Sequence, residues 1–200
     1  MSTTITAKDV AALRARTGAG MMDCKKALEE TGGDVEKAVD LLRQKGIARA
    51  AKRSDRGATE GVIGSYVHFN GKVAVLVELN CETDFVARTS DFQQLAKDIC
   101  LHIASASPIA VSEDMVPAEV LEREKAIFRA QAAESGKPPA VQEKMVDGKV
   151  RKFFEERVLL DQPFVKDDSQ KVGDLVKALS GKLGERVVVR RFARLEVGGE

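Results

Sequence analysis

Side chains that could carry out catalytic chemistry are few in this sequence and do not form a known catalytic pattern. Each of its four Gly-Lys pairs is followed by Val, Pro or Leu, not by the Ser or Thr of a phosphate-binding loop. No Ser or Cys lies in a recognisable nucleophile signature. A zinc site needs about four clustered ligands, whereas the candidates are widely spaced: Cys24, Cys81, Cys100, His68 and His102. We therefore predict a protein that is not an enzyme and that uses no cofactor or metal.

The segment NCETDFVAR, Asn80–Arg88, has a composition suited to contacting another molecule. Phe85 follows Asp84, so a rigid apolar side chain stands beside a carboxylate. The segment connects a predicted strand to a predicted helix, and such turns often display side chains outward. Against this, an aromatic residue in a loop is more often packed inside the protein. Residue types alone leave both positions of Phe85 open.

A second unusual segment is TGAGMMDCKKAL, Thr17–Leu28. Neighbouring residues on a helix point about 100° apart. We therefore expect one of Met21 and Met22 to be buried and the other to lean outward. An exposed methionine suits an adaptable apolar contact; the alternative is that both methionines fill gaps in a small core.

The overall composition is that of a globular protein and restricts the possible partners. The chain has 200 residues, 44% of them hydrophobic, and a net charge of +1, which argues against a dedicated nucleic-acid binder. Residues 43–56 are locally basic, with six Lys or Arg and one Asp, and read as a solvated helical linker or as a basic contact surface. No apolar run reaches the roughly 18 residues of a membrane span. We predict a cytoplasmic protein with reduced cysteines and no membrane partner.

Three helix signatures follow one another in the first 46 residues. Thr6 and Asp9 have the spacing of a capping box, and the helix that they start should end in the TGAG segment. The second helix is expected over Met21–Thr31. The third begins after the Asp34 cap and should end near Gly46. Such a small bundle can bury only a marginal core.

From Gly61 onward the pattern changes to strands mixed with helices. Residues 61–80 alternate apolar and polar types around Asn70-Gly71, which predicts a type I′ hairpin. The second strand should bury one face, formed by Val73, Val75, Val77 and Leu79. Four helices are then expected: one capped by Ser90, one from Pro117 to near Gly136, one after Pro138-Pro139, and one over 171–179. A last strand, 186–197, should carry on one face Val187, Val189, Ala193, Leu195 and Val197. This order predicts an α+β fold, with a small antiparallel sheet packed with helices.

Several stretches together resemble the elongation factor Ts family, in its short bacterial form. The resemblance is carried by Leu13–Gly46, Glu60–His68, Glu78–Arg88, Ser135–Pro138, Glu143–Val150 and Gln162–Asp167. The resemblance implies a ubiquitin-associated (UBA)-like three-helix domain with a basic helical linker at 1–53 and an α+β core, or dimerisation, domain at 54–200. It also implies the function: a guanine nucleotide exchange factor for elongation factor Tu, a GTPase that it binds in the GDP-bound and nucleotide-free states.

The family also implies roles for individual residues. Arg14, Met21 and Met22 would contact the GTPase domain of the partner. A second set would enter beside the nucleotide and dislodge its Mg²⁺: Thr83, Asp84, Phe85 and Val86. In that set Phe85 would act as the wedge, and Asp84 would disturb the network that holds the ion.

Long family members carry two similar core subdomains, whereas this chain shows one hairpin-plus-helix unit. The resemblance therefore implies a homodimer that supplies the second copy. The dimer contact could use the sheet edge or the apolar face of strand 186–197, unless the chain's own helices cover that face. Two other classes stay open: an interaction module without exchange activity, and an RNA-binding ribosomal accessory protein that would use the basic segment.

Overall fold

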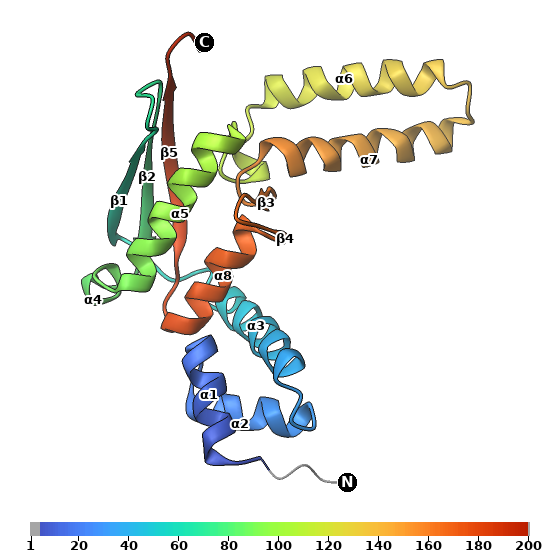
Figure 1. Ribbon diagram of the computed structural model, residues 1–200. Helices are drawn as coiled ribbons and strands as arrows, with labels where there is room; N and C mark the ends of the chain where they lie inside the picture. The colour runs from blue at the N-terminus through green and yellow to red at the C-terminus, as the bar shows by residue number, and fades with distance from the viewer. Residues whose placement is uncertain (1–4, 200) are drawn as a thin grey trace.

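The structure is a computed structural model that describes residues 5–199, and it confirms the α+β class (Figure 1). The amino-terminal unit consists of α1 (Ala7–Thr17), α2 (Met21–Glu30) and α3 (Val35–Ala51). The main sheet is antiparallel, in the order β1-β2-β5, with β1 (Glu60–Val67), β2 (Val73–Cys81) and β5 (Val188–Glu196). The other elements are α4 (Asp84–Ala87), α5 (Ser90–Ala106), the 3₁₀ turn η1 (Glu113–Met115), α6 (Ala118–Glu134), α7 (Pro139–Arg157), β3 (Pro163–Phe164), β4 (Asp167–Lys171) and α8 (Val172–Leu183).

The three-helix unit forms from the local signals that predict it. At the start of α1, the Thr6 hydroxyl accepts a hydrogen bond from the Asp9 N–H at 3.2 Å, and the Asp9 carboxylate accepts one from the Thr6 N–H at 2.9 Å. Gly18 ends α1 with a φ of 68°. The unit has a small core of its own, which contains Val10, Leu13, Cys24, Ala27, Leu28, Ala38 and Leu42. Its three helices are consistent with a UBA-like module.

The third helix does not end near Gly46 as predicted, but continues to Ala51. Gly46 marks a close crossing with α8. A Cβ added to Gly181 would lie 2.7 Å from the Gly46 Cα. The basic segment 43–56 is helical as far as Ala51 and none of its residues is buried, but α3 also packs along α8 of the core.

The hairpin between β1 and β2 also differs from its prediction. A type I′ turn needs a positive φ at both central residues, but only Gly71 of the Asn70-Gly71 pair has one, at 68°. The Gly71 N–H donates to the His68 carbonyl at 2.8 Å, and the His68 N–H donates to the Val73 carbonyl at 2.8 Å. The connection is thus longer, and Asn70 keeps an ordinary backbone conformation.

The main core lies between the sheet and helices α5 and α8, which cover one face of it (Figure 1). On β2, Val75, Val77 and Leu79 are buried as predicted, while Val73 is half-buried. The helix predicted to be capped by Ser90 is capped one residue earlier. The Thr89 hydroxyl accepts from the Phe92 N–H at 3.4 Å.

A β-bulge in β5 overturns the predicted face of this strand. Leu79 pairs with Val189 and Glu78 pairs with Arg191, so Arg190 is an extra residue in the ladder. Before the bulge, Val187 and Val189 are buried in the core. After the bulge the alternation is reversed, which leaves Ala193, Leu195 and Val197 exposed. The prediction failed because one inserted residue exchanges the two faces of a strand.

The second face of the sheet is exposed and carries several large apolar side chains together with the Glu78–Arg191 ion pair. The large exposed side chains on it are Ile63, Val67, Leu76 and Leu195, which we call the open sheet face. Leu76 and Leu195 are 52% and 72% exposed. In Figure 1, α5 and α8 lie on the opposite side of the sheet.

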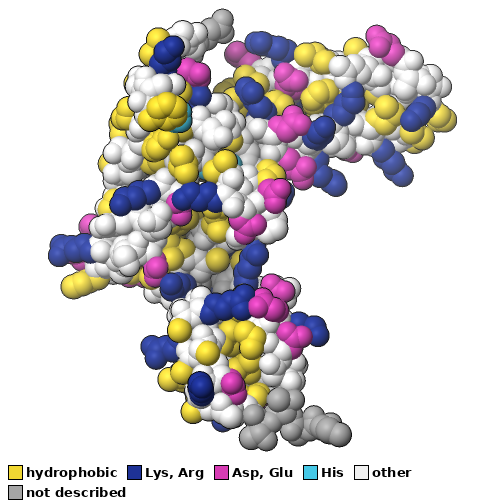
Figure 2. Space-filling view, viewed as in Figure 1, with side chains coloured by type: hydrophobic (Ala, Val, Ile, Leu, Met, Phe, Trp, Pro, Cys, Tyr) yellow, Lys and Arg dark blue, Asp and Glu magenta, His cyan; other side chains and the backbone are white. Residues whose placement is uncertain are grey.

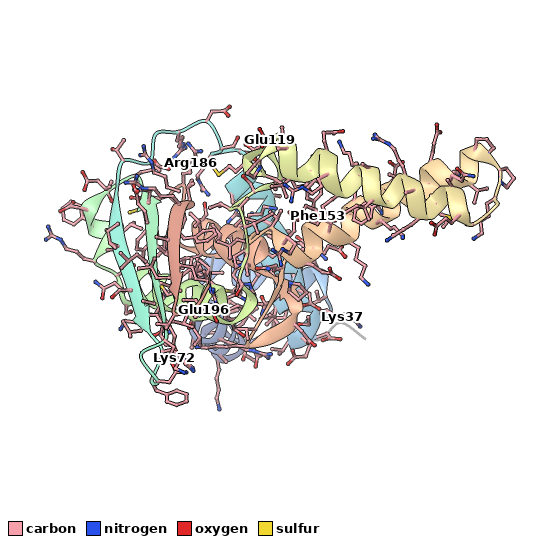
Figure 3. The ribbon with its side chains drawn as sticks, turned by 90° about the horizontal axis from the view of Figure 1, so that it is seen from above. Lys37, Lys72, Glu119, Phe153, Arg186 and Glu196 are labelled. Atoms are coloured by element: carbon pink, nitrogen blue, oxygen red, sulfur yellow. The ribbon has the colours of Figure 1, made fainter. Side chains whose placement is uncertain are left out.

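Helices α6 and α7 form a long hairpin that projects from the body (Figures 1 and 3). Phe153 lies between the two helices near their base (Figure 3). A small cluster joins this base to the core through Ala110, Val116 and Val158.

Candidate partner-binding site

The predicted wedge segment forms a single helical turn, α4, directly after β2. Thr83 caps this turn, and its hydroxyl accepts a hydrogen bond from the Val86 N–H at 3.4 Å. Val86 packs against the main core and Ala87 is buried, so the second half of the turn is anchored inward. The first half, with Asp84 and Phe85, is left facing outward.

Phe85 is 78% exposed, so the expectation of burial that its residue type favours is wrong for this position. The core positions of the turn are already taken by Val86 and Ala87. Figure 2 shows hydrophobic side chains protruding at the position of α4. Asp84 is paired with Arg88, whose Nη2 lies 2.7 Å from the carboxylate. A rigid apolar ring and a charged pair are therefore displayed together.

A carboxylate from a distant part of the chain holds this turn in place. Glu185 lies between α8 and β5, and its Oε2 accepts hydrogen bonds from the N–H groups of Glu82 and Thr83, at 3.1 and 3.0 Å. Its Oε1 accepts from the Thr83 hydroxyl at 2.7 Å. Three donors on one half-buried carboxylate fix the backbone that leads into Phe85. We call this contact the Glu185 clamp.

A second carboxylate bonds in the opposite direction, from the turn to the segment that carries Glu185. The Glu82 carboxylate accepts from the Arg186 N–H at 2.7 Å, and this contact is the main reason that the pKa of Glu82 lies below its ordinary value. Arg56, just after α3, approaches the same carboxylate at 3.4 Å. This contact ties the segment between α3 and β1 to the start of the displayed turn.

Cys81 also supports the turn that carries Phe85, from the core side. Its buried thiol donates a hydrogen bond to the Thr83 carbonyl at 3.1 Å. Burial, together with the nearby Glu185 carboxylate, raises the pKa of Cys81 to about 11. Such a thiol stays protonated at neutral pH and acts as a small packed donor, not as a nucleophile.

The second predicted contact set lies on the three-helix unit. Arg14 on α1 is exposed, and Met21 and Met22 are 49% and 62% exposed. The expectation that one methionine is buried is wrong, because the core positions of α2 are occupied by smaller or later residues: Cys24, Ala27 and Leu28. Both thioethers are available to a partner.

The structure does not bring the two contact sets into one cluster. Figure 1 shows α4 at one end of the sheet, apart from α1 and α2. A partner that touches both sets must therefore be large enough to span the amino-terminal unit and the core. Among residues 5–199, no group of three or more His, Cys, Asp or Glu side chains could hold a metal ion. None of the described helices could cross a membrane.

The sequence gives little sign of the clamp. Glu185 and Glu82 are 103 residues apart, and Glu185 follows an ordinary Gly-rich helix end. The only local signal is that Gly184, with a φ of 77°, turns the chain at the end of α8. Such long-range hydrogen bonds become visible only once the sheet order is known.

Known proteins support the resemblance over almost the whole chain. The family model described as elongation factor TS matches residues 5–199. Similar proteins named elongation factor Ts occur in Syntrophomonas wolfei, with 57% identity over 97% of this chain and 91% of the relative, and in Thermosipho melanesiensis, with 55% identity over 97% and 99%. A third, from Syntrophobacter fumaroxidans, is 50% identical over the full length of both chains. With these matches along nearly its full length, the chain belongs to the elongation factor Ts family.

Proposed function

We propose that the protein is a guanine nucleotide exchange factor for elongation factor Tu, acting in the cytoplasm during translation elongation. The observation that carries this proposal is Phe85, which is 78% exposed on a turn held by the Glu185 clamp. Exposing an aromatic ring to water stabilises nothing within the chain, and burying it against a partner is worth about 1.5–3 kcal/mol. In this mechanism Phe85 enters beside the nucleotide site while Asp84 perturbs the network around the bound Mg²⁺.

Nucleotide exchange requires only a modest coupling free energy between the binding of this protein and the binding of GDP. The factor stabilises the nucleotide-free GTPase, and by linkage it must bind the GDP-loaded form more weakly by the same factor. Each tenfold loss of GDP affinity takes about 1.4 kcal/mol of coupling. Insertion of one ring and weakening of the ion's contacts are of the right size for several such steps. The protein supplies no covalent chemistry of its own.

The amino-terminal unit, residues 1–53, acts in this proposal as the docking module. Arg14, Met21 and Met22 are its exposed contact residues. Thr83 and Val86 shape and anchor the wedge turn, and Phe85 and Asp84 touch the partner. The core, residues 54–200, carries the wedge and the dimer contact.

We further propose that the chain forms a homodimer through the open sheet face. The face is exposed and carries several large apolar side chains, and two antiparallel sheets can pack face to face. A two-fold contact places the same patch on both protomers. Of the strand face first considered for this contact, Val187 and Val189 are covered within the core, whereas Ala193, Leu195 and Val197 lie beyond the bulge and are exposed.

The exchange proposal is tested with Phe85→Ala. We expect this variant to accelerate release of a fluorescent GDP analogue from elongation factor Tu at least about tenfold less than the unaltered protein, because the lost burial is worth more than 1.4 kcal/mol. Phe69→Ala is the matched control, because Phe69 is 92% exposed at the β1–β2 hairpin but lies outside the wedge turn. Unchanged exchange by Phe85→Ala would reject the wedge. No acceleration by the unaltered protein would reject the function.

A further inference from the structure

A cavity lies where the three-helix unit meets α8, and its walls are strongly basic. Its volume is about 470 Å³, within the range of small-molecule sites. Helices α1, α2 and α3 form one wall, and the end of α8 forms the other. The cations that line it are Arg16, Arg43, Lys45, Arg49, Arg53 and Lys182. The one acidic residue in its walls is Asp23.

Four of these cations already have carboxylate partners. Arg16 pairs with Glu36, Lys45 with Glu30, Arg49 with Asp23, and Lys182 with Asp91, all within 2.9 Å. Within residues 5–199, neither Arg43 nor Arg53 makes an ion pair within 4 Å, although the charge of Arg43 helps to lower the pKa of Asp167 and that of Arg53 helps to lower the pKa of Glu82. Arg43 and Arg53 are therefore the two lining cations that have no direct carboxylate contact in the described part of the chain.

Of these two arginines, Arg53 gives the stronger indication of a bound ligand. Its Nη1 is buried and makes no hydrogen bond within the described residues. A buried guanidinium nitrogen without an acceptor costs free energy, and such a group calls for a bound water or ion. Arg49 lies on α3 and Arg53 in the turn that follows the end of this helix, and both line the cavity.

We propose that this cavity binds a small phosphate-bearing anion of up to nucleotide size, with Arg53 as the principal ligand and Arg43 as the second. Arginine binds phosphate oxygens through paired N–H groups, which would satisfy the orphaned Nη1. The apolar part of the wall, Val39, Leu42 and Ala178, offers a surface for a non-phosphate portion. A bound anion would bridge α3 and α8 and so fix the docking module against the core.

Pyrophosphate is the probe, titrated into the full-length protein by isothermal calorimetry at low salt, in the absence of any GTPase. We expect saturable binding with one anion per chain, and about tenfold weaker binding by Arg53→Gln, since a hydrogen bond between charged groups is lost. Arg43→Gln should weaken binding as well. Arg190→Gln removes the same charge from exposed β5 and should bind like the unaltered protein.

Three results would overturn the proposal: no saturation at millimolar pyrophosphate, an equal loss of affinity in Arg190→Gln, or tighter binding of a single-stranded RNA oligomer with a steep dependence on salt. The last result would mean that the basic wall serves a polymer backbone. A thermal unfolding curve of each variant without pyrophosphate separates loss of binding from loss of folding. Because no partner is needed, this test is independent of the exchange assay.

Discussion

At the scale of single residues, the wedge turn shows how an exposed side chain can be held rigidly. Phe85 makes little contact with its own chain, and its position comes from Thr83 and Val86 on either side. Thr83 is in turn held by Glu185 from the far end of the sequence, and Val86 by its packing against the main core. The sequence could identify the turn and its charged neighbour, but not the clamp, because hydrogen bonds between residues about a hundred positions apart leave no local pattern.

The clamp should be necessary for fast exchange. Glu185→Gln leaves one oxygen to accept hydrogen bonds and introduces an NH₂ that faces donor groups, so the turn loses part of its support. We expect the exchange rate to fall by about tenfold or more, since small misplacements of positioned groups are costly.

The readout for this prediction is the maximal exchange rate, measured separately from the affinity for the partner. Glu122→Gln on α6 removes the same charge from an exposed ion pair and is the control. If Glu185→Gln exchanges at the normal maximal rate, the turn does not need the clamp.

A buried histidine should make stability depend on pH. His102 is 1% exposed, its Nε2 bonds Gln162 Oε1 at 2.9 Å, and its Nδ1 accepts the Val165 N–H at 3.2 Å. This arrangement fits the neutral ring, and burial lowers the pKa of His102 below its ordinary value of 6.5. The unfolded chain therefore takes up a proton more readily than the folded one.

We expect the free energy of unfolding to be constant with respect to this group above pH 6.5 and to fall as the pH drops below that value. Urea unfolding at pH 7.5 and 5.5 measures the change, and an NMR titration of the His102 ring should give a pKa below 6.5. His68→Gln is the control, because it leaves the buried ring in place. A His102 ring that titrates at or above 6.5 would contradict the prediction.

At the scale of elements, most helices and strands follow from the sequence, and the errors have identifiable causes. Gly46 has the spacing of a helix end, but in the structure it allows α3 to approach α8. The pair Asn70-Gly71 predicts a type I′ turn, but it also fits longer turns with one left-handed residue. The alternation of residues predicts one continuous face on β5, but a bulge at Arg190 interrupts that alternation.

The crossing of α3 and α8 should not tolerate a side chain. A methyl group at Gly181 would lie 2.7 Å from the Cα and from the carbonyl oxygen of Gly46, both of them backbone atoms that cannot rotate away. Gly181→Ala should therefore destabilise the protein by about 1–3 kcal/mol, the usual cost of overpacking.

The control is a Gly→Ala substitution at a helical position where the added methyl group meets no neighbouring atom. Gly148 lies inside α7 with nothing within 4 Å of an added Cβ, so Gly148→Ala should stabilise the protein by about 0.5–1 kcal/mol. Chemical denaturation of both variants gives the comparison. Equal effects of the two substitutions would mean that the helices do not pack as closely as described.

At the scale of the whole molecule, the chain has three parts with different surfaces: an amino-terminal three-helix unit, a sheet with one open face, and a projecting helical hairpin (Figures 1 and 3). The class and order of these parts could be predicted from the sequence. The open face could not, because its apolar residues alternate with core residues on the same strands, and the bulge decides which group points outward.

If the open sheet face joins two protomers, a charge placed there should separate them. Leu195→Lys puts an ammonium group on the open sheet face, where its desolvation in a dimer contact is costly. Sedimentation should show a monomer for this variant and a dimer for the unaltered chain. Ile127→Lys, on α6 and also exposed, should stay dimeric. A monomeric unaltered chain at micromolar concentration would reject the dimer.

The bulge in β5 also determines where the strand can change length. Arg190 has no partner residue in the β2–β5 ladder. Its deletion would therefore leave all the remaining residues of β5 facing the same way as before. Loss of Arg191 would have the same effect, because the two neighbouring residues are both arginine, whereas loss of a residue between Phe192 and Leu195 would reverse the facing of part of the strand. When related sequences are aligned, we therefore expect a one-residue gap in this strand to fall at the bulge.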